Sequence, residues 1–225
     1  MSIKVIRAFQ FQNNLSVDGV AGPNTNAMAD RVLLPYDKMP EVPDYCPVVR
    51  DESVGTDYER MVWSWANWFA NAGAREIGGN NSGPWVAFFH KIPDDGDPDN
   101  DGSWCASFQA TCFERAARQV NITAPMTYSR RQRGGAKALF GCVARAGGRV
   151  KVEDLEPYQI YVICWDRGTY AWQGHIELGY YDPVRDDFVT IGGNVGSFKR
   201  VAGRVRKFRH ESWQHKLHGI ARLGA

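Results

Sequence analysis

The 225-residue sequence lacks several features that would place it in a class at once. No run approaches the roughly twenty apolar residues of a membrane-spanning helix, and the first residues lack the apolar stretch and cleavage site of a secretory signal. Lys and Arg number only 27 against 25 Asp and Glu, too small an excess for a dedicated nucleic-acid-binding protein. We expect synthesis in a cytoplasm, no integral membrane segment, no nucleic-acid partner and a monomer.

Two metal signatures are also missing. No HExxH motif occurs, and no CxxC pair occurs among the five cysteines, so a zinc site of closely spaced thiolates is disfavoured. An odd number of cysteines cannot all pair in disulfides. We expect a reduced protein with mostly buried thiols, among which a single reactive one could occur. The cysteines are Cys46, Cys105, Cys112, Cys142 and Cys164.

Apolar periodicity predicts helices in the first part of the chain and strands in the second. Four prolines between residues 35 and 47 indicate a linker. We therefore expect a small helical module at 1–36, a Pro-rich linker at 37–55 and a catalytic domain at 56–225. Helices are predicted over 56–77, 84–90 and 105–119, and strands over 158–164, 175–181, 188–191 and 204–209. This order indicates an α+β fold, with helices packed against an antiparallel sheet.

Cys105 is the cysteine best placed to be a nucleophile. It follows a Gly-Ser pair at the start of a predicted helix, where unpaired N–H groups and the helix dipole favour an anion. A thiolate in such a position has a lowered pKa, and the same N–H groups suit the oxyanion of a tetrahedral intermediate. A buried structural cysteine is the alternative, and we prefer that interpretation for Cys112, Cys142 and Cys164.

A thiolate nucleophile needs a general base, usually a histidine whose ring is held by a third group. His175 opens a predicted strand directly after a turn, and Asn194 ends or follows the next strand. Adjacent antiparallel strands would bring Asn194 beside His175. Glu177 shares the face of His175 and is a possible accessory group, although it need not reach the ring. A structural histidine is the alternative interpretation.

Four motifs in this region resemble those of CHAP-type amidohydrolases of the NlpC/P60 superfamily, in the same order. The resemblance runs from Trp68 to Ser197, about half the chain. Gly192 is a departure, because some members of the family carry an acid at that place. The motifs are A-R-E-I-G at 74–78 with Asn80 and Asn81, W-C-A-S-F at 104–108, W-Q-G-H-I at 172–176 and I-G-G-N at 191–194.

The resemblance implies a papain-like domain that cleaves amide bonds of peptidoglycan and requires no cofactor. Matched residue by residue, it implies that Cys105 is the nucleophile, His175 the base and Asn194 the group that orients the ring. Trp104, Trp172 and Gln173 flank this site and are expected in the substrate cleft, although Trp104 could equally be a core residue.

A second resemblance lies near the N-terminus. Residues 6–10 and 15–25 are similar to the core of small three-helix peptidoglycan-binding modules, of which about half is present. A Gly-rich turn followed by a helix that begins with proline lets the backbone approach a ligand. The resemblance implies ligand contacts from Phe9, Gln10, Asp18, Gly19, Gly22 and Thr25. The alternative is a segment that only packs onto the catalytic domain.

An acidic loop precedes the nucleophile. Asp97, Asp99 and Asp101 alternate as the oxygen ligands of a calcium loop do, but Phe108 stands where an EF-hand loop has its glutamate. We prefer a solvated loop to a calcium site. A basic run after residue 199 fits an anionic cell surface or, as we prefer, a charged edge strand.

The sequence thus predicts a peptidoglycan hydrolase of the phage-endolysin type, either an N-acetylmuramoyl-L-alanine amidase or a peptide endopeptidase. Such a protein would be made in the host cytoplasm and would act on the cell wall after release. One alternative is the same hydrolase deployed as an antibacterial toxin or bacterial autolysin. Another is a non-catalytic wall-binding or virion structural protein, and a metal-dependent hydrolase is the third.

Overall fold

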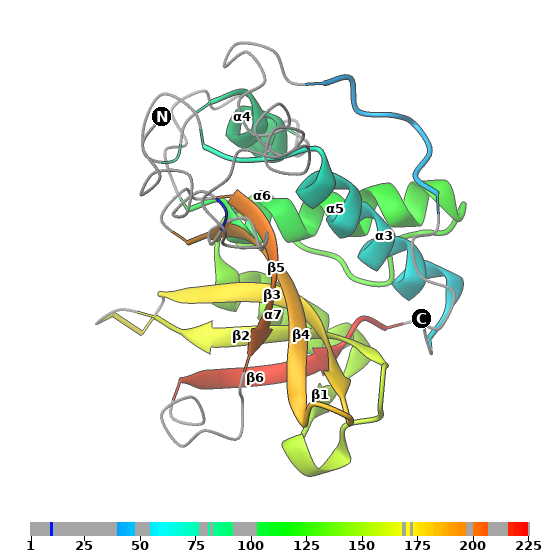
Figure 1. Ribbon diagram of the computed structural model, residues 1–225, viewed down its shortest axis with the longest axis vertical. Helices are drawn as coiled ribbons and strands as arrows, with labels where there is room; N and C mark the ends of the chain where they lie inside the picture. The colour runs from blue at the N-terminus through cyan, green and yellow to red at the C-terminus, as the bar shows by residue number, and fades with distance from the viewer. Residues whose placement is uncertain are drawn as a thin grey trace. The chain divides into compact units, whose positions relative to one another are not determined.

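The computed structural model is shown in Figure 1. It describes residues 10, 40–47, 55–76, 81, 83–91, 103–167, 170–171, 173–196, 200–206 and 216–224. The chain divides into two compact units, residues 1–40 and 41–225. Of the first unit only Gln10, which is helical and buried, and Pro40 are described, so the limits predicted for the N-terminal module lie outside the described residues.

Helix α3 (Asp57–Asn71) begins as its sequence predicts. Thr56 is the N-cap, and its side chain and that of Glu59 form a reciprocal capping box. The helix was expected to reach residue 77 but ends at Asn71, because Gly73 takes a left-handed φ of 75° and turns the chain away. The carbonyl of Ala74 then accepts a hydrogen bond from Val201 N, so the segment joins the sheet instead.

The other helices are α4 (Pro84–Lys91), α5 (Cys105–Gln119), α6 (Arg130–Arg133), α7 (Ala136–Gly147) and the short 3-10 helix η1 (Val152–Asp154). Helices α4 and α5 confirm the predictions for 84–90 and 105–119. No helix had been predicted at α6 or α7. Among the described residues no helix is both long and apolar enough to cross a membrane.

Six antiparallel strands form one sheet in the order β1-β6-β2-β3-β4-β5. Strands β2 to β5 correspond to the four predicted strands, and the basic strand β5 lies at the end of the sheet order, where an edge-strand role was expected. Strands β1 and β6 had not been predicted. The strands are β1 (Arg149–Val150), β2 (Ile160–Asp166), β3 (Gly174–Asp182), β4 (Asp187–Val195), β5 (Arg200–Arg206) and β6 (Leu217–Arg222).

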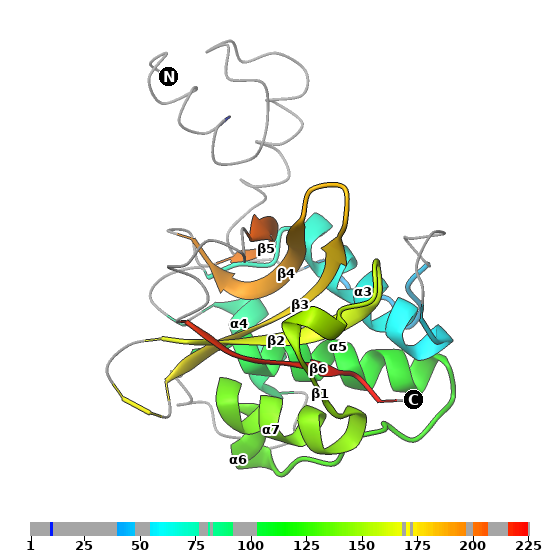
Figure 2. The same cartoon turned by 90° about the horizontal axis from the view of Figure 1, so that it is seen from below.

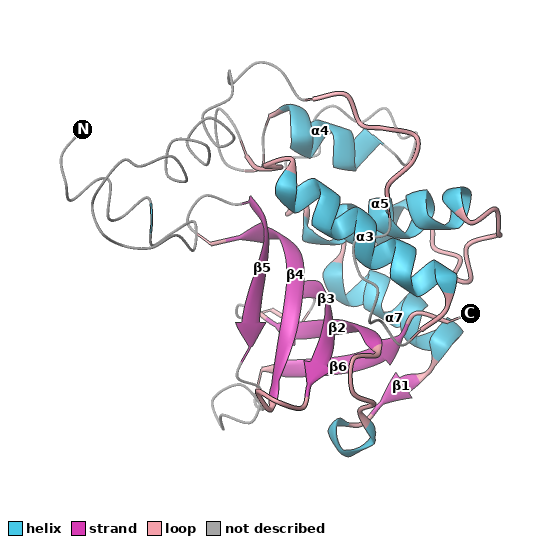
Figure 3. Ribbon diagram, turned by 45° about the vertical axis from the view of Figure 1, so that its right-hand side comes forward, coloured by secondary structure: helices cyan, strands magenta, loops and turns pink. Residues whose placement is uncertain are grey.

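Helices α3, α4 and α5 gather on one side of the sheet (Figure 3). Helix α5 lies against β3 and β4, and α7 lies against β2, β3 and β6 (Figure 2). Two glycines allow this close packing. A Cβ on Gly193 of β4 would lie 2.9 Å from Phe108 of α5, and one on Gly219 of β6 would lie 2.7 Å from Phe140 of α7. The fold is therefore α+β, as the sequence indicates.

The opposite face of the sheet carries its own apolar cluster. Gly219 pairs with Cys164, so the neighbours Ile163 and Trp165 point away from α7. Trp165 pairs with His175 and Ile163 with Glu177, which places both candidate site residues on this second face. The buried cluster consists of Tyr161, Ile163, Trp165, Phe188 and Ile220.

Residues 41–47, which lie within the predicted Pro-rich linker, belong to the second unit and form hydrogen bonds with its helices. Cys46 is fully buried, and its backbone N–H and carbonyl form hydrogen bonds of 3.0 and 2.7 Å with the amide of Gln119. The indole of Trp65 donates to the same Gln119 oxygen, and Arg115 donates to the carbonyl of Pro43. Prolines prevent this segment from forming a helix. Its backbone N–H and C=O groups therefore remain available for hydrogen bonds with side chains of α5.

Candidate active site

Cys105 is the first residue of α5, as predicted, and its side chain is buried. The residue before it, Trp104, is anchored on both sides. Its ring stacks on Phe89 at a centroid distance of 5.4 Å, and its indole N–H donates to Glu76 Oε1 at 2.9 Å. These contacts hold the start of the helix, and with it the thiol, in one place.

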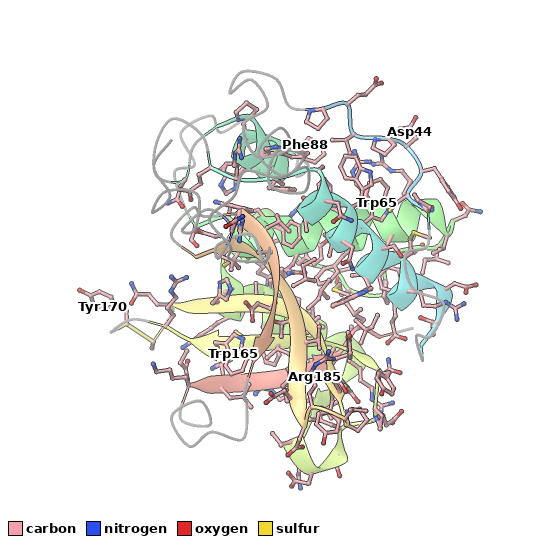
Figure 4. All side chains as sticks on the ribbon, viewed as in Figure 1. Asp44, Trp65, Phe88, Trp165, Tyr170 and Arg185 are labelled. Atoms are coloured by element: carbon pink, nitrogen blue, oxygen red, sulfur yellow. The ribbon has the colours of Figure 1, made fainter. Side chains whose placement is uncertain are left out.

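His175 lies at the start of β3, and its imidazole is held by a carboxylate. Nε2 of the ring is 3.1 Å from Oε1 of Glu177. The second oxygen of Glu177 accepts a hydrogen bond of 3.1 Å from the indole N–H of Trp165, on the adjacent strand β2 (Figure 4). Glu177 is fully buried. A buried carboxylate with both oxygens engaged fixes the orientation of the ring and favours its protonated form.

The second ring nitrogen of His175 is the one available to the thiol. Nδ1 is buried and has no partner at full hydrogen-bonding geometry among the described residues. The ring and the Cys105 side chain nevertheless lie close enough for each to shift the pKa of the other. Such contacts are often loose without substrate and tighten in the reacting complex.

The electrostatics favour a thiolate–imidazolium pair. Burial by itself raises the pKa of the Cys105 thiol, but interactions with the His175 side chain, the backbone N–H of Ile176 and the hydroxyl of Ser103 outweigh it, and the pKa is lowered. Burial lowers the pKa of His175, but contacts with Cys105 and Glu177 outweigh that effect and raise it to about 9. The ring is therefore protonated at neutral pH, and the lowered pKa of Cys105 shifts its thiol toward the thiolate.

Three of the other cysteines, Cys46, Cys112 and Cys164, have the opposite electrostatics, which separates them from Cys105. All five are free and buried. Burial raises the pKa of Cys46 to about 11 and that of Cys164 to about 12, and it raises the pKa of Cys112 as well. These thiols are neutral at physiological pH and behave as small apolar side chains.

Gly192 on β4 leaves room for the side chain of Glu177. A Cβ at this position would lie 2.8 Å from Cγ of Glu177 and 3.3 Å from its Oε1. The carboxylate that contacts His175 therefore occupies the space in front of Gly192, where some CHAP enzymes carry their acid. Glycine at 192 on β4 and glutamate at 177 on β3 fit together, because a side chain at position 192 would displace that of Glu177.

Asn194 forms no hydrogen bond with the His175 ring among the described residues, and the ring nitrogen Nε2 contacts Glu177 instead. Its amide nitrogen donates to Ser103 Oγ at 3.0 Å and to Asn81 Oδ1 at 3.3 Å. The pairing of β3 with β4 ends at Leu178 and Ile191, and β4 is irregular between residues 192 and 195, where Asn194 has a φ of 60°. That irregularity turns the amide toward the residues just before Cys105.

The residues expected in the substrate cleft divide into three cases. Trp104 is fully buried, so its core interpretation holds and the cleft prediction was wrong. Gln173 is half-buried, and its side chain accepts from Tyr170 N in the turn between β2 and β3, where Tyr170 projects outward (Figure 4). Trp172 lies outside the described residues.

Other predicted site residues also lie outside the described residues. They are Asp97, Asp99 and Asp101 of the acidic loop, and Phe9, Asp18, Gly19, Gly22 and Thr25 of the N-terminal motif. Within the described part of the chain, no group of three or more His, Cys, Asp or Glu side chains could hold a metal ion.

Comparison with known proteins does not assign the chain to a family. No family model matches the sequence, and no curated protein matches it significantly. The interpretation of the site consequently depends on the residues themselves and on the motifs quoted above.

Sequence reasoning placed Cys105 and His175 together but underrated Glu177. The signal was present, since Glu177 lies two residues after His175 in a strand and so shares its face. Glycine at position 192, which leaves space for a neighbouring side chain, was a second signal for Glu177. Ser103, which contacts both Cys105 and Asn194, was not singled out, because a serine before a helix is most simply interpreted as a cap.

Proposed function

We propose that this protein is a cysteine-dependent hydrolase of amide bonds in peptidoglycan, with Cys105 as nucleophile, His175 as acid and base, and Glu177 as the group that orients the ring. The observation that carries the proposal is the thiol at a helix start, facing an imidazole held by a buried carboxylate. Such a constellation activates a thiol for acyl transfer.

The reaction follows from the charges of the pair. The Cys105 thiolate adds to the amide carbonyl, and the tetrahedral anion collapses as the imidazolium of His175 protonates the leaving amine. A thioester remains on Cys105. His175, now neutral, takes a proton from water, whose oxygen attacks the thioester and releases the carboxylic acid. The thiol and the ring are restored, and no external electron donor or acceptor takes part.

The substrate class and the fold family are supported by the motifs. Described residues of the four segments that resemble CHAP-type enzymes contribute to the site, and an α+β architecture with Cys105 on a helix and His175 on a strand is compatible with the papain-like NlpC/P60 fold that we propose. The peptidoglycan-binding motif before residue 36 supports the same substrate independently. An endolysin, made in the host cytoplasm and released to the wall, is the setting that we propose.

The test is digestion of purified peptidoglycan, with the products identified by mass spectrometry. Wild type is compared with Cys105→Ala and with Cys112→Ala, which removes a neutral, buried thiol from the same helix. We expect hydrolysis by wild type and by Cys112→Ala but none by Cys105→Ala. Peptides freed from glycan would indicate an amidase, and shortened cross-links would indicate an endopeptidase.

Two outcomes would contradict the proposal. Intact peptidoglycan after treatment with wild type, in the presence of reductant and calcium, would favour a binding or structural protein. Hydrolysis by a folded Cys105→Ala variant would remove the thiol from the mechanism. Including calcium in one arm and a chelator in another also tests whether the segment with Asp97, Asp99 and Asp101 matters to activity.

A further inference from the structure

The described residues Ser103, Asn194 and Asn81, none of which is hydrogen-bonded to the imidazole, form a chain of polar side chains that ends at the Cys105 sulfur. Ser103 Oγ lies 3.8 Å from Sγ of Cys105. The same hydroxyl oxygen is 3.0 Å from the amide nitrogen of Asn194, which is also 3.3 Å from Oδ1 of Asn81. Ser103 is exposed, whereas Asn194 and Cys105 are buried, so Ser103 lies where the thiol meets solvent.

The direction of these hydrogen bonds follows from what each group can do. An amide nitrogen only donates, so the oxygen of Ser103 accepts from Asn194. A hydroxyl has one proton, and that proton remains to be donated elsewhere. A thiolate only accepts, and it lies within range for sulfur. The order is therefore Asn194 to Ser103 to Cys105, with the last proton on the negative sulfur.

The backbone around this chain is consistent with a positioning role. Asn194 has a φ of 60° and Asn81 a φ of 53°, in the left-handed region that residues other than glycine seldom adopt. Strained residues of this kind persist where surrounding contacts hold them, and they concentrate at functional sites. Here the turn in β4 points the Asn194 amide at Ser103.

We propose that Ser103 is a positioning residue that stabilises the Cys105 thiolate by donating its hydroxyl proton to the sulfur, and that Asn194 keeps the hydroxyl in the donating orientation. The inference rests on the proposed function only in taking Cys105 as the nucleophile. It gives Asn194 a role toward the sulfur in place of the predicted role toward the ring. The Ser103 interaction is among those that lower the pKa of Cys105.

The other groups that act on the thiol must be kept constant in the test. The titratable groups that interact with Cys105 are His175, with Glu177 behind it on β3, and Cys164 on β2, whose pKa the negative charge of Cys105 raises. None of these is altered by changes at Ser103 or Asn194. The charge state of Cys105 is followed by the ultraviolet absorbance of its thiolate, taken as the difference from Cys105→Ala, and by the rate of alkylation with iodoacetamide.

The first comparison is Ser103→Ala with Ser103→Thr. Loss of a hydrogen bond to a charged group should reduce the thiolate population, and the alkylation rate, about tenfold or more on the acid side of the titration. The rates should converge at alkaline pH, where every variant is ionised. Threonine retains a hydroxyl and should restore the wild-type titration, which a loss of packing or fold would not allow.

The second comparison tests the link through Asn194 with a double-mutant cycle. Asn194→Gly removes the amide and suits the left-handed backbone. It should displace the thiol titration in the wild-type background but have little effect in the Ser103→Ala background. An unchanged titration in Ser103→Ala would overturn the role of Ser103, and an equal effect of Asn194→Gly in both backgrounds would overturn the relay. Neither readout uses peptidoglycan, so failure of the proposed substrate would not be mistaken for failure of this inference.

Discussion

Replacing Glu177 with glutamine changes two oxygens into one oxygen and one amide nitrogen at the centre of the site. In the structure, Oε1 of Glu177 contacts Nε2 of His175 and Oε2 accepts from the indole of Trp165. When Nδ1 of His175 faces the thiol, Nε2 carries a proton, so His175 and Trp165 both donate a hydrogen bond to Glu177. A carboxylate accepts from both at once, but an amide can accept from only one of them through its single oxygen.

The His175 ring can respond to Glu177→Gln in two ways, by keeping its tautomer or by changing it. If the ring keeps its tautomer, one buried donor faces the amide nitrogen, at a cost of about 1–3 kcal/mol in the free energy of unfolding. For a chain of this size that lowers the melting temperature by about 2–10 °C. If the ring changes tautomer, its proton moves to Nδ1, and the ring can no longer accept the proton of Cys105. Hydrolysis should fall by about a thousandfold or more, as it does when the orienting acid of such a triad becomes an amide.

The assay combines peptidoglycan hydrolysis, thiolate absorbance and thermal unfolding. Glu59→Gln is the matched control, because Glu59 is also buried and its two oxygens accept from Thr56 N and from Gln159 Nε2. It should lose stability by a similar amount, because it suffers the same chemical change, while its thiolate titration and hydrolysis stay close to wild type.

The reasoning would be refuted by a Glu177→Gln variant that hydrolyses peptidoglycan at the wild-type rate with an unchanged thiolate titration. Equal losses of hydrolysis in Glu177→Gln and Glu59→Gln would also contradict it, because the effect would then come from general destabilisation.

Three further predictions concern the same site. Because the pKa of Cys105 is lowered and that of His175 is raised to about 9, hydrolysis should fall as pH rises through about 9, where the leaving amine loses its proton donor, whereas alkylation of the thiolate should not fall. The interactions that raise the His175 pKa above its unfolded value of 6.5 stabilise the fold fully below that pH, and this contribution should disappear toward pH 9 in unfolding measurements. Gly192→Ala should lower hydrolysis about tenfold or more, because the new Cβ would displace Glu177 and misplace the ring. Gly203→Ala on β5, whose added Cβ would meet only Thr190 O at 3.5 Å, is its control, and equal activity of the two variants would contradict the steric argument.

Local sequence carried much of the fold. The capping box at Thr56 and the apolar periodicity after it are encoded within one window, so the start of α3 could be predicted, as could the helix that begins at Cys105. The end of α3 could not, because the chain beyond Gly73 pairs with β5 more than a hundred residues later. Strand β6 was missed for a similar reason, since its place between β1 and β2 depends on a distant segment.

For the candidate site, the sequence by itself indicated Cys105 and His175, because a cysteine at a helix start and a histidine at a strand start are local features. Tertiary structure decided how they are supported. Whether Glu177 or Asn194 holds the ring depends on where β3 and β4 stop pairing, on the left-handed turn at Asn194 and on the space in front of Gly192. Each of these is a contact between segments distant in sequence, and alternation along a single strand carries no information about it.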